Sequence, residues 1–202
     1  MPAPETSHET RPVLGHVNLM VDSFIANAEL DDMRAVIRTL LATSPPSVTA
    51  TFTNAARRRL EKMNAKSLSP STRLFVKSLD GLTRPTPELY STLGRARALY
   101  GAGMGFASLS LLTEVVHATV GAVWDEAGEM ADVLAAIDAD VTQAIQSAKE
   151  EMASGRVTDP GAARAVVGAL QDALQRSERD TEIWGGDFAF ERGAVSVQYW
   201  KF

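Results

Sequence analysis

The sequence contains no cysteine, few aromatic residues and no long apolar run. The absence of cysteine excludes disulfide bridges, thiolate metal sites and cysteine nucleophiles. The longest uncharged apolar stretch, Ala98 to Thr113, has sixteen residues including three glycines, so it is too short to span a membrane. The first residues, Met1 to Glu9, are polar and lack the regions of a signal peptide. We therefore expect a soluble intracellular protein with no membrane partner.

Charge is distributed unevenly along the chain. The 202 residues carry a net charge of −5, which argues against a globally basic nucleic-acid binder. Residues 51–100 nevertheless have a local balance of +7, and residues 101–150 have a balance of −7. This asymmetry fits either basic helices packed beside acidic ones, or a basic surface for a polyanion with acidic surface elsewhere.

Apolar residues recur at helical spacing through most of the chain. Pro45 and Pro46 end one such segment, while Asp159 and Pro160 supply a cap and a first helical position for another. The pattern predicts helices at about 28–42, 48–65, 87–100, 106–123, 126–153 and 160–180. The expected fold class is all-α, an antiparallel helix bundle with extra helices and a minor extended component.

Composition divides the chain into three regions. Residues 1–12, rich in Pro, Thr, Ser and Glu, are typical of a flexible N-terminal arm. Residues 13–183 are expected to form the helical bundle. Residues 184–202 hold six aromatic side chains and no long helical period, and the alternation of Phe188 and Phe190 predicts a short extended segment.

The sequence offers little for catalysis or for a cofactor. The run from Gly101 to Gly105 lacks the Gly-Lys-Ser/Thr ending of a phosphate loop, so it predicts a helix break or close packing. Glu114 and His117 lie one helical turn apart, as an acid–base pair would, but a single histidine on an apolar helix is more often a packing residue. No cluster has metal-ligand spacing. We expect a protein that is not an enzyme and uses no cofactor or metal.

Basic residues flank two of the expected helices. Arg95 and Arg97 lie near the end of the helix at 87–100, and Arg156 lies just before the helix at 160–180. If these two helices are antiparallel neighbours, the arginines meet at one end of the bundle, beside the N–H groups of a helix start. Such an end suits an RNA phosphate. Asp159 beside it suits a sugar hydroxyl, or acts only as a helix cap.

Several short motifs follow one another in a specific order. A helix pair over Leu30–Met63 precedes the segment Ser69-Pro70-Ser71-Thr72-Arg73-Leu74-Phe75. Arg156-Val157-Thr158-Asp159 precedes the last long helix, and Phe190-Glu191-Arg192 follows it, with Trp200 further on. In this order, over about residues 28–202, the chain resembles the coat proteins of rod-shaped plant RNA viruses, the family of tobacco mosaic virus.

The resemblance implies a four-helix bundle that self-assembles into a helical rod or disc around single-stranded RNA. Such a protein is found in the virion, and in the host cytoplasm during assembly. The resemblance also implies that Arg95, Arg97, Arg156 and Asp159 face the RNA. Glu61 matches a carboxylate that faces another across a subunit interface, where protonation or a cation would favour assembly.

The chain departs from this family pattern in its middle. Residues 101–155 are expected to be helical and acidic, where the tobacco mosaic virus pattern has a loop. By the same register, the densest basic run, Arg57-Arg58-Arg59, lies away from the RNA end and serves subunit contacts.

Two other classes of protein stay open. One is a cellular helical adaptor, which would bind a partner protein through the long amphipathic helix at 126–153 and would not bind RNA. The other is a helical enzyme, which would need a pocket around Glu114 and His117. A coat protein forms extended assemblies that lengthen with RNA, whereas an adaptor stays a small oligomer.

Overall fold

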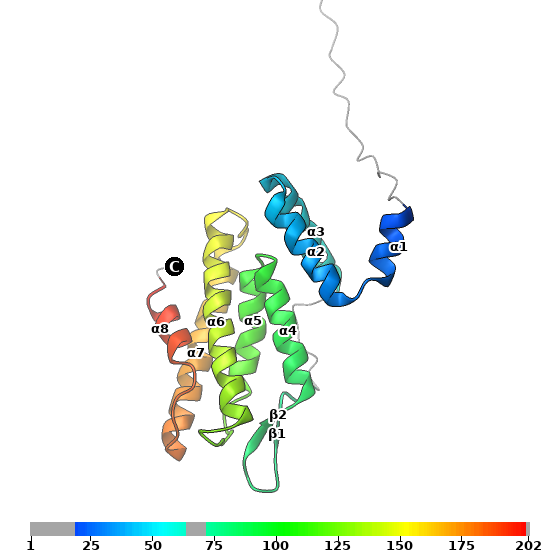
Figure 1. The fold of residues 1–202 in the computed structure, drawn as a ribbon. Coiled ribbons are helices and arrows are strands. Elements are labelled where there is room, and N and C mark those ends of the chain that lie inside the picture. The colour runs from blue at the N-terminus through cyan, green and yellow to red at the C-terminus, as the bar shows by residue number, and fades with distance from the viewer. Residues whose placement is uncertain (1–18, 64–71, 201–202) are drawn as a thin grey trace, which may run out of the picture. The chain divides into compact units, whose positions relative to one another are not determined.

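The computed structural model describes residues 19–63 and 72–200 (Figure 1). The chain forms two compact units, residues 1–49 and 50–202, which divide within one helix. The flexible arm expected for residues 1–12 lies outside the described residues. Within the described residues the chain is mostly helical, so the all-α class is confirmed.

The first unit contains α1 (Leu19–Asn27), α2 (Leu30–Thr43) and the start of α3 (Pro46–Lys62). Asp31 lies in the first turn of α2, where the positive end of the helix dipole stabilises a carboxylate, and it pairs with Arg34 at 2.8 Å. The helix ends at Thr43 because prolines follow at positions 45 and 46. Neither α2 nor α3 contains a buried residue.

A small hairpin precedes the bundle of the second unit. Its strands, β1 (Phe75–Lys77) and β2 (Thr83–Pro85), pair antiparallel with Phe75 opposite Pro85. The Thr86 hydroxyl donates to the carbonyl of Leu74 at 2.9 Å, and its oxygen accepts from the backbone N–H of Leu89. Thr86 therefore both closes the base of the hairpin and caps the next helix.

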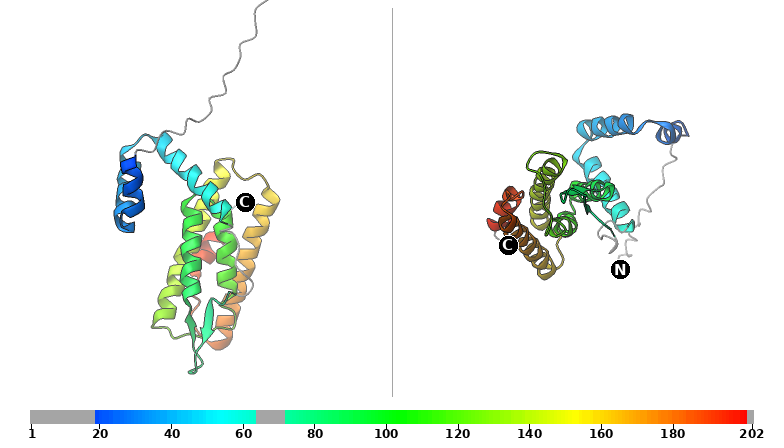
Figure 2. Two further views of the ribbon diagram at one scale, coloured as in Figure 1. Left: turned by 90° about the vertical axis from the view of Figure 1, so that its right-hand side faces the viewer. Right: turned by 90° about the horizontal axis from the view of Figure 1, so that it is seen from below.

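Four antiparallel helices build most of the second unit: α4 (Pro87–Gly101), α5 (Gly105–His117), α6 (Glu129–Ala153) and α7 (Pro160–Trp184). Successive helices run in opposite directions, as Figures 1 and 2 show. The α5 helix packs against α4, α6 and α7, and α4 also packs against α6. Consequently α5 lies at the centre of the contacts, and seven of its thirteen residues are buried, among them Leu109, Leu112 and Val115.

The last helix, α8 (Glu191–Gln198), packs against α6 and α7 (Figure 2). Asp138 of α6 accepts a hydrogen bond from the backbone N–H of Gly193 at 2.7 Å and another from Nε of Arg192 at 3.0 Å. The expectation of an extended C-terminal segment is therefore wrong for residues 191–198. A carboxylate from α6 stabilises the first turn of this helix, much as a cap within the helix would.

The described core is formed by α4 to α8, with Leu74 beside the hairpin. Phe190, Leu109 and Leu111 are among its largest fully buried side chains. Residues 101–155, where the chain departs from the virus pattern, supply two of the core helices, α5 and α6. The coat-protein form of a four-helix bundle stays a prediction.

Candidate functional site

A groove of about 740 Å³ opens at one end of the second unit. The turn between α4 and α5 and the turn between α6 and α7 meet there, and α3 covers one side. Its charged lining consists of Arg57, Glu61, Glu151, Arg156 and Asp159. Its volume lies in the range of small-molecule sites, so this groove is the candidate functional site.

Two arginine side chains converge over Gly103. Nε of Arg57 donates to the carbonyl of Ala102 at 2.6 Å, which fixes its guanidinium against the turn. Gly103 has a φ of +69° and no side chain. A Cβ there would lie 2.5 Å from Nη2 of Arg57 and 3.3 Å from Nη2 of Arg156. Glycine thus supplies both the left-handed turn and the space that the two guanidinium groups occupy.

The environment of Arg57 disfavours its charged form. Burial lowers the pKa of Arg57, and the positive charge of Arg156 lowers it further. Glu151 and Glu61 act in the opposite direction, but more weakly. The groove therefore holds a positive charge that its surroundings do not fully compensate.

Two of the groove's carboxylates are engaged by backbone groups. Glu151 accepts a hydrogen bond from the N–H of Phe106, in the first turn of α5, at 3.2 Å. Asp159 accepts one from the N–H of Ala162, in the first turn of α7, at 3.0 Å. Asp159 is therefore the cap of α7, as the sequence predicted. Glu61, on α3, is exposed.

The structure brings together three of the five residues expected in functional sites: Glu61, Arg156 and Asp159. Arg95, half-buried on α4, is not among the residues that line the groove. Arg97 lines a separate groove between α4 and α6. The sequence had placed these two arginines beside Arg156, on the condition that α4 and α7 are neighbours. The two helices instead share α5 as a packing partner.

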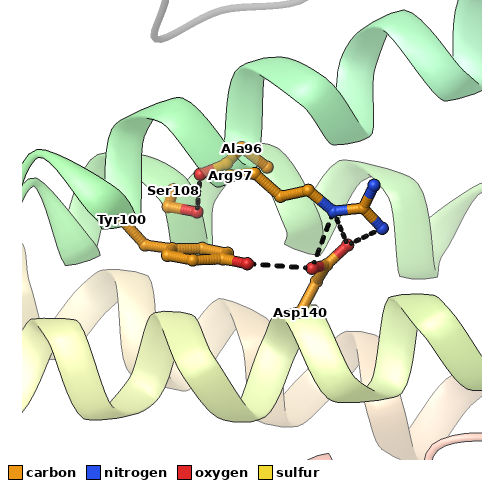
Figure 3. A network of polar contacts seen from close by, with 5 residues as sticks. All are labelled: Ala96, Arg97, Tyr100, Ser108 and Asp140. Carbon is orange, nitrogen blue, oxygen red and sulfur yellow. Dashed lines mark hydrogen bonds and ion pairs between the residues drawn. The ribbon is translucent and has the colours of Figure 1, made fainter. Parts of the chain in front are cut away.

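Arg97, whose side chain is 48% exposed, forms an ion pair with the buried Asp140 of α6 (Figure 3). Its Nη2 lies 2.8 Å from Oδ2 of Asp140, and its Nε lies 3.0 Å from each of the two carboxylate oxygens. The hydroxyl of Tyr100 donates to the same carboxylate at 3.1 Å. Asp140 is buried, so Arg97 compensates a carboxylate of α6 that water does not reach. This contact links α4 to α6.

The same network shifts two pKa values. The hydrogen bond to Asp140 raises the pKa of Arg97 despite partial burial. Burial raises the pKa of Tyr100, and the charge of Asp140 raises it further. Arg97 is therefore held in its charged form by its own chain, and its positive charge is already balanced.

No family model, no curated protein and no solved structure matches this chain. The candidate site therefore rests on geometry alone.

Sequence reasoning missed the role of Arg57. The register of the resemblance placed the run Arg57-Arg58-Arg59 away from Arg156, and this is wrong for Arg57. The signal was present in the helical spacing, because Arg57 lies one turn from Leu60 on the side of α3 that packs on the core. Arg58 and Arg59 are exposed.

The alternative enzyme site does not form a described pocket. His117 and Glu114 are both exposed on α5 and line none of the described grooves. Among residues 19–63 and 72–200, no three His, Asp or Glu side chains are arranged to hold a metal ion. No helix in these same ranges is long and apolar enough to cross a membrane.

Proposed function

We propose that this chain is a structural protein that assembles with copies of itself, as coat proteins of rod-shaped RNA viruses do. One observation carries the proposal. The α1 and α2 helices leave large apolar side chains 46–62% exposed: Val21, Phe24, Ile25, Leu30, Val36 and Leu40. Apolar surface of this kind, over consecutive helices, is typical of a contact site for another protein.

Charge complementarity supports a second copy of the chain as the partner. Exposed basic side chains lie on α3, at Arg58, Arg59 and Lys62. Exposed acidic side chains lie around the start of α6, at Asp125, Glu126, Glu129 and Asp132. A contact between the basic surface of one copy and the acidic surface of the next is head-to-tail, and repeated contacts of this type form open helical assemblies.

The coat-protein function adds single-stranded RNA to this assembly. Arg57 and Arg156 support it, because they place two positive charges at one end of the second unit. Arg97 gives no such support, since Asp140 already neutralises it. Glu61, exposed at the same groove, is the carboxylate proposed to lie in a subunit interface.

A second candidate is the adaptor, which binds a different protein and not RNA. The pairing of Arg97 with Asp140 favours it, because the charge of one arginine expected to face RNA is already balanced within the chain. The exposed apolar side chains of α1 and α2 would then contact a foreign protein.

Light scattering distinguishes these functions through the mass of the purified chain. The mass is measured at pH 5 and pH 8, with and without single-stranded RNA. Negative-stain electron microscopy then shows the form of any assembly. Rods or discs that lengthen with RNA support the coat protein. Oligomers that ignore RNA support self-assembly and overturn the coat-protein function. A monomer under every condition overturns self-assembly and leaves the adaptor.

Two sets of variants test the contact itself. Leu40→Asp should reduce the oligomer mass, whereas Ile183→Asp, at an exposed position on α7, should not. Reversing the charges of Arg58 and Arg59 to Glu should also weaken assembly. Reversing Asp125 and Glu126 to Arg in the same chain should restore it. Failure of this rescue would contradict the head-to-tail contact.

A further inference from the structure

Arg57 and Arg156 form a pair of cations that the neighbouring Glu151 and Glu61 compensate only in part. The Nη2 atoms of Arg57 and Arg156 lie 2.5 and 3.3 Å from the position that a Cβ of residue 103 would take. The two nitrogen atoms are therefore at most about 6 Å apart. Among the described residues, neither side chain forms an ion pair with a carboxylate. An oxyanion between the two guanidinium groups would relieve their repulsion and accept hydrogen bonds from both.

None of the groove's three carboxylates forms an ion pair with either arginine, and Glu61, on α3, is exposed. Glu151 and Asp159 bind the backbone N–H groups of Phe106 and Ala162, at the starts of α5 and α7. Their negative charge is partly satisfied by these helix ends. The arginine donors directed toward Gly103 are thereby left for a ligand from outside the chain.

The floor of the groove is apolar. Phe106 and Val166, both half-buried, line it beside the arginine pair and supply its accessible apolar surface, whereas Met104 is buried. A ligand with only a charged group would leave this surface in contact with water. An apolar body attached to the oxyanion would cover it and gain binding free energy.

We propose that the groove binds a small organic oxyanion, whose phosphate or carboxylate group lies between Arg57 and Arg156 and whose apolar body lies over Phe106 and Val166. This inference does not depend on self-assembly, but it uses the two arginines that support RNA binding, so a small oxyanion and RNA are alternative ligands of this groove. A compact ligand fits the charge pattern better than a polynucleotide, because a phosphate chain crossing the groove would also meet Glu61, Glu151 and Asp159.

Isothermal titration calorimetry on the full chain tests the proposal, with phenyl phosphate, inorganic phosphate, benzoate, phenol and oligouridylate as probes. We expect phenyl phosphate to bind roughly tenfold tighter than inorganic phosphate, because of its ring. A comparison of phenyl phosphate with benzoate identifies the preferred acid group. Phenol, which lacks the charge, should bind far more weakly than either.

Arg156→Gln replaces one of the two guanidinium groups, on an exposed side chain, by a neutral amide. It should weaken phenyl phosphate binding roughly tenfold without loss of folding. Arg57→Lys keeps the charge of the other cation but loses the fork of donors, and it should also weaken binding. Arg176→Gln, at an exposed position on α7 that lines none of the described grooves, is the matched control and should bind as the wild type does.

Three results would overturn the proposal. The first is that neither phenyl phosphate nor benzoate binds. The second is an equal loss of binding in the Arg156 and Arg176 variants, which would indicate general charge attraction. The third is binding of oligouridylate alone, which would assign the groove to a polynucleotide. The oligomer mass is measured in the same samples, so a failure here is distinguishable from a failure of self-assembly.

Discussion

Gly105 lies where α5 and α6 approach most closely, and replacing it by alanine tests the packing of the bundle. A Cβ at this position would fall inside van der Waals contact with the backbone of Ser147 and Ala148, 2.6 Å from the carbonyl carbon of Ser147. Backbone atoms have no rotamer to change. The Ser147 hydroxyl also donates to the carbonyl of Tyr100 at 2.8 Å, which fixes α6 beside the end of α4.

The expected cost of Gly105→Ala is about 2–3 kcal/mol, at the upper end of the range for overpacked cores. For a chain of this size, this corresponds to a fall of roughly 5–10 °C in the unfolding temperature. Urea unfolding followed by circular dichroism measures the free energy directly. The cost arises because α5 and α6 would have to separate to admit the methyl group of the alanine.

Gly94 and Gly168 provide matched controls, since both lie within helices and a Cβ at either would meet no atom within 4 Å. Alanine there should stabilise the protein by about 0.5–1 kcal/mol, because it loses less backbone entropy than glycine. If Gly105→Ala stabilises the chain as these controls do, the close approach of α5 to α6 is refuted.

Three further perturbations test single contacts. Tyr100→Phe should flatten the loss of stability at high pH, because burial and then the charge of Asp140 raise the pKa of Tyr100 in the folded state. The contribution of Tyr100 is complete below about pH 10 and disappears as the pH rises through the folded-state pKa. Parallel stability profiles of the two proteins from about pH 9 to 11.5 would contradict the raised pKa of Tyr100. Asp159→Ala should cost about 1 kcal/mol in urea unfolding, with Asp159→Asn close to wild type, because the cap needs only an oxygen acceptor. Asp138→Ala should speed hydrogen exchange in residues 191–198, since the N–H of Gly193 loses its acceptor; unchanged exchange would show that packing alone holds α8.

The starts of the long helices could be predicted from the sequence because their signals are local. Pro87 and Pro160 each occupy a first helical turn, and Asp159 caps the second of these helices. The glycine run was also interpreted correctly as a break with close packing, since Gly103 turns the chain and Gly105 admits the backbone of α6.

The conformation of the C-terminal region could not be predicted in the same way. The alternation of Phe188 and Phe190 suggested an extended segment, but α8 begins immediately afterwards, at Glu191. The acceptor that stabilises its first turn, Asp138, comes from a helix more than fifty residues earlier. No local pattern contains that contact, and tertiary structure overrides the propensity of the segment.

Charged residues show the same limit at the candidate site. The sequence predicted that Arg97 faces RNA, and it contained no sign of the ion pair that Arg97 forms with Asp140, 43 residues away. It identified Arg156 and Asp159 correctly as neighbours at a helix start, because they are close in sequence. Arg57 reaches them from α3 through a contact that only the folded chain reveals.

The position of α8 has a consequence for synthesis on the ribosome. Phe190 is fully buried and Val197 nearly so, and both belong to the same core as α4 to α7. Because chains are made from the N-terminus, the four long helices leave the ribosome before the residues that complete their core. The bundle thus exposes the apolar surface beside α6 that Phe190 and Val197 cover until residues 190–197 have left the ribosome and packed.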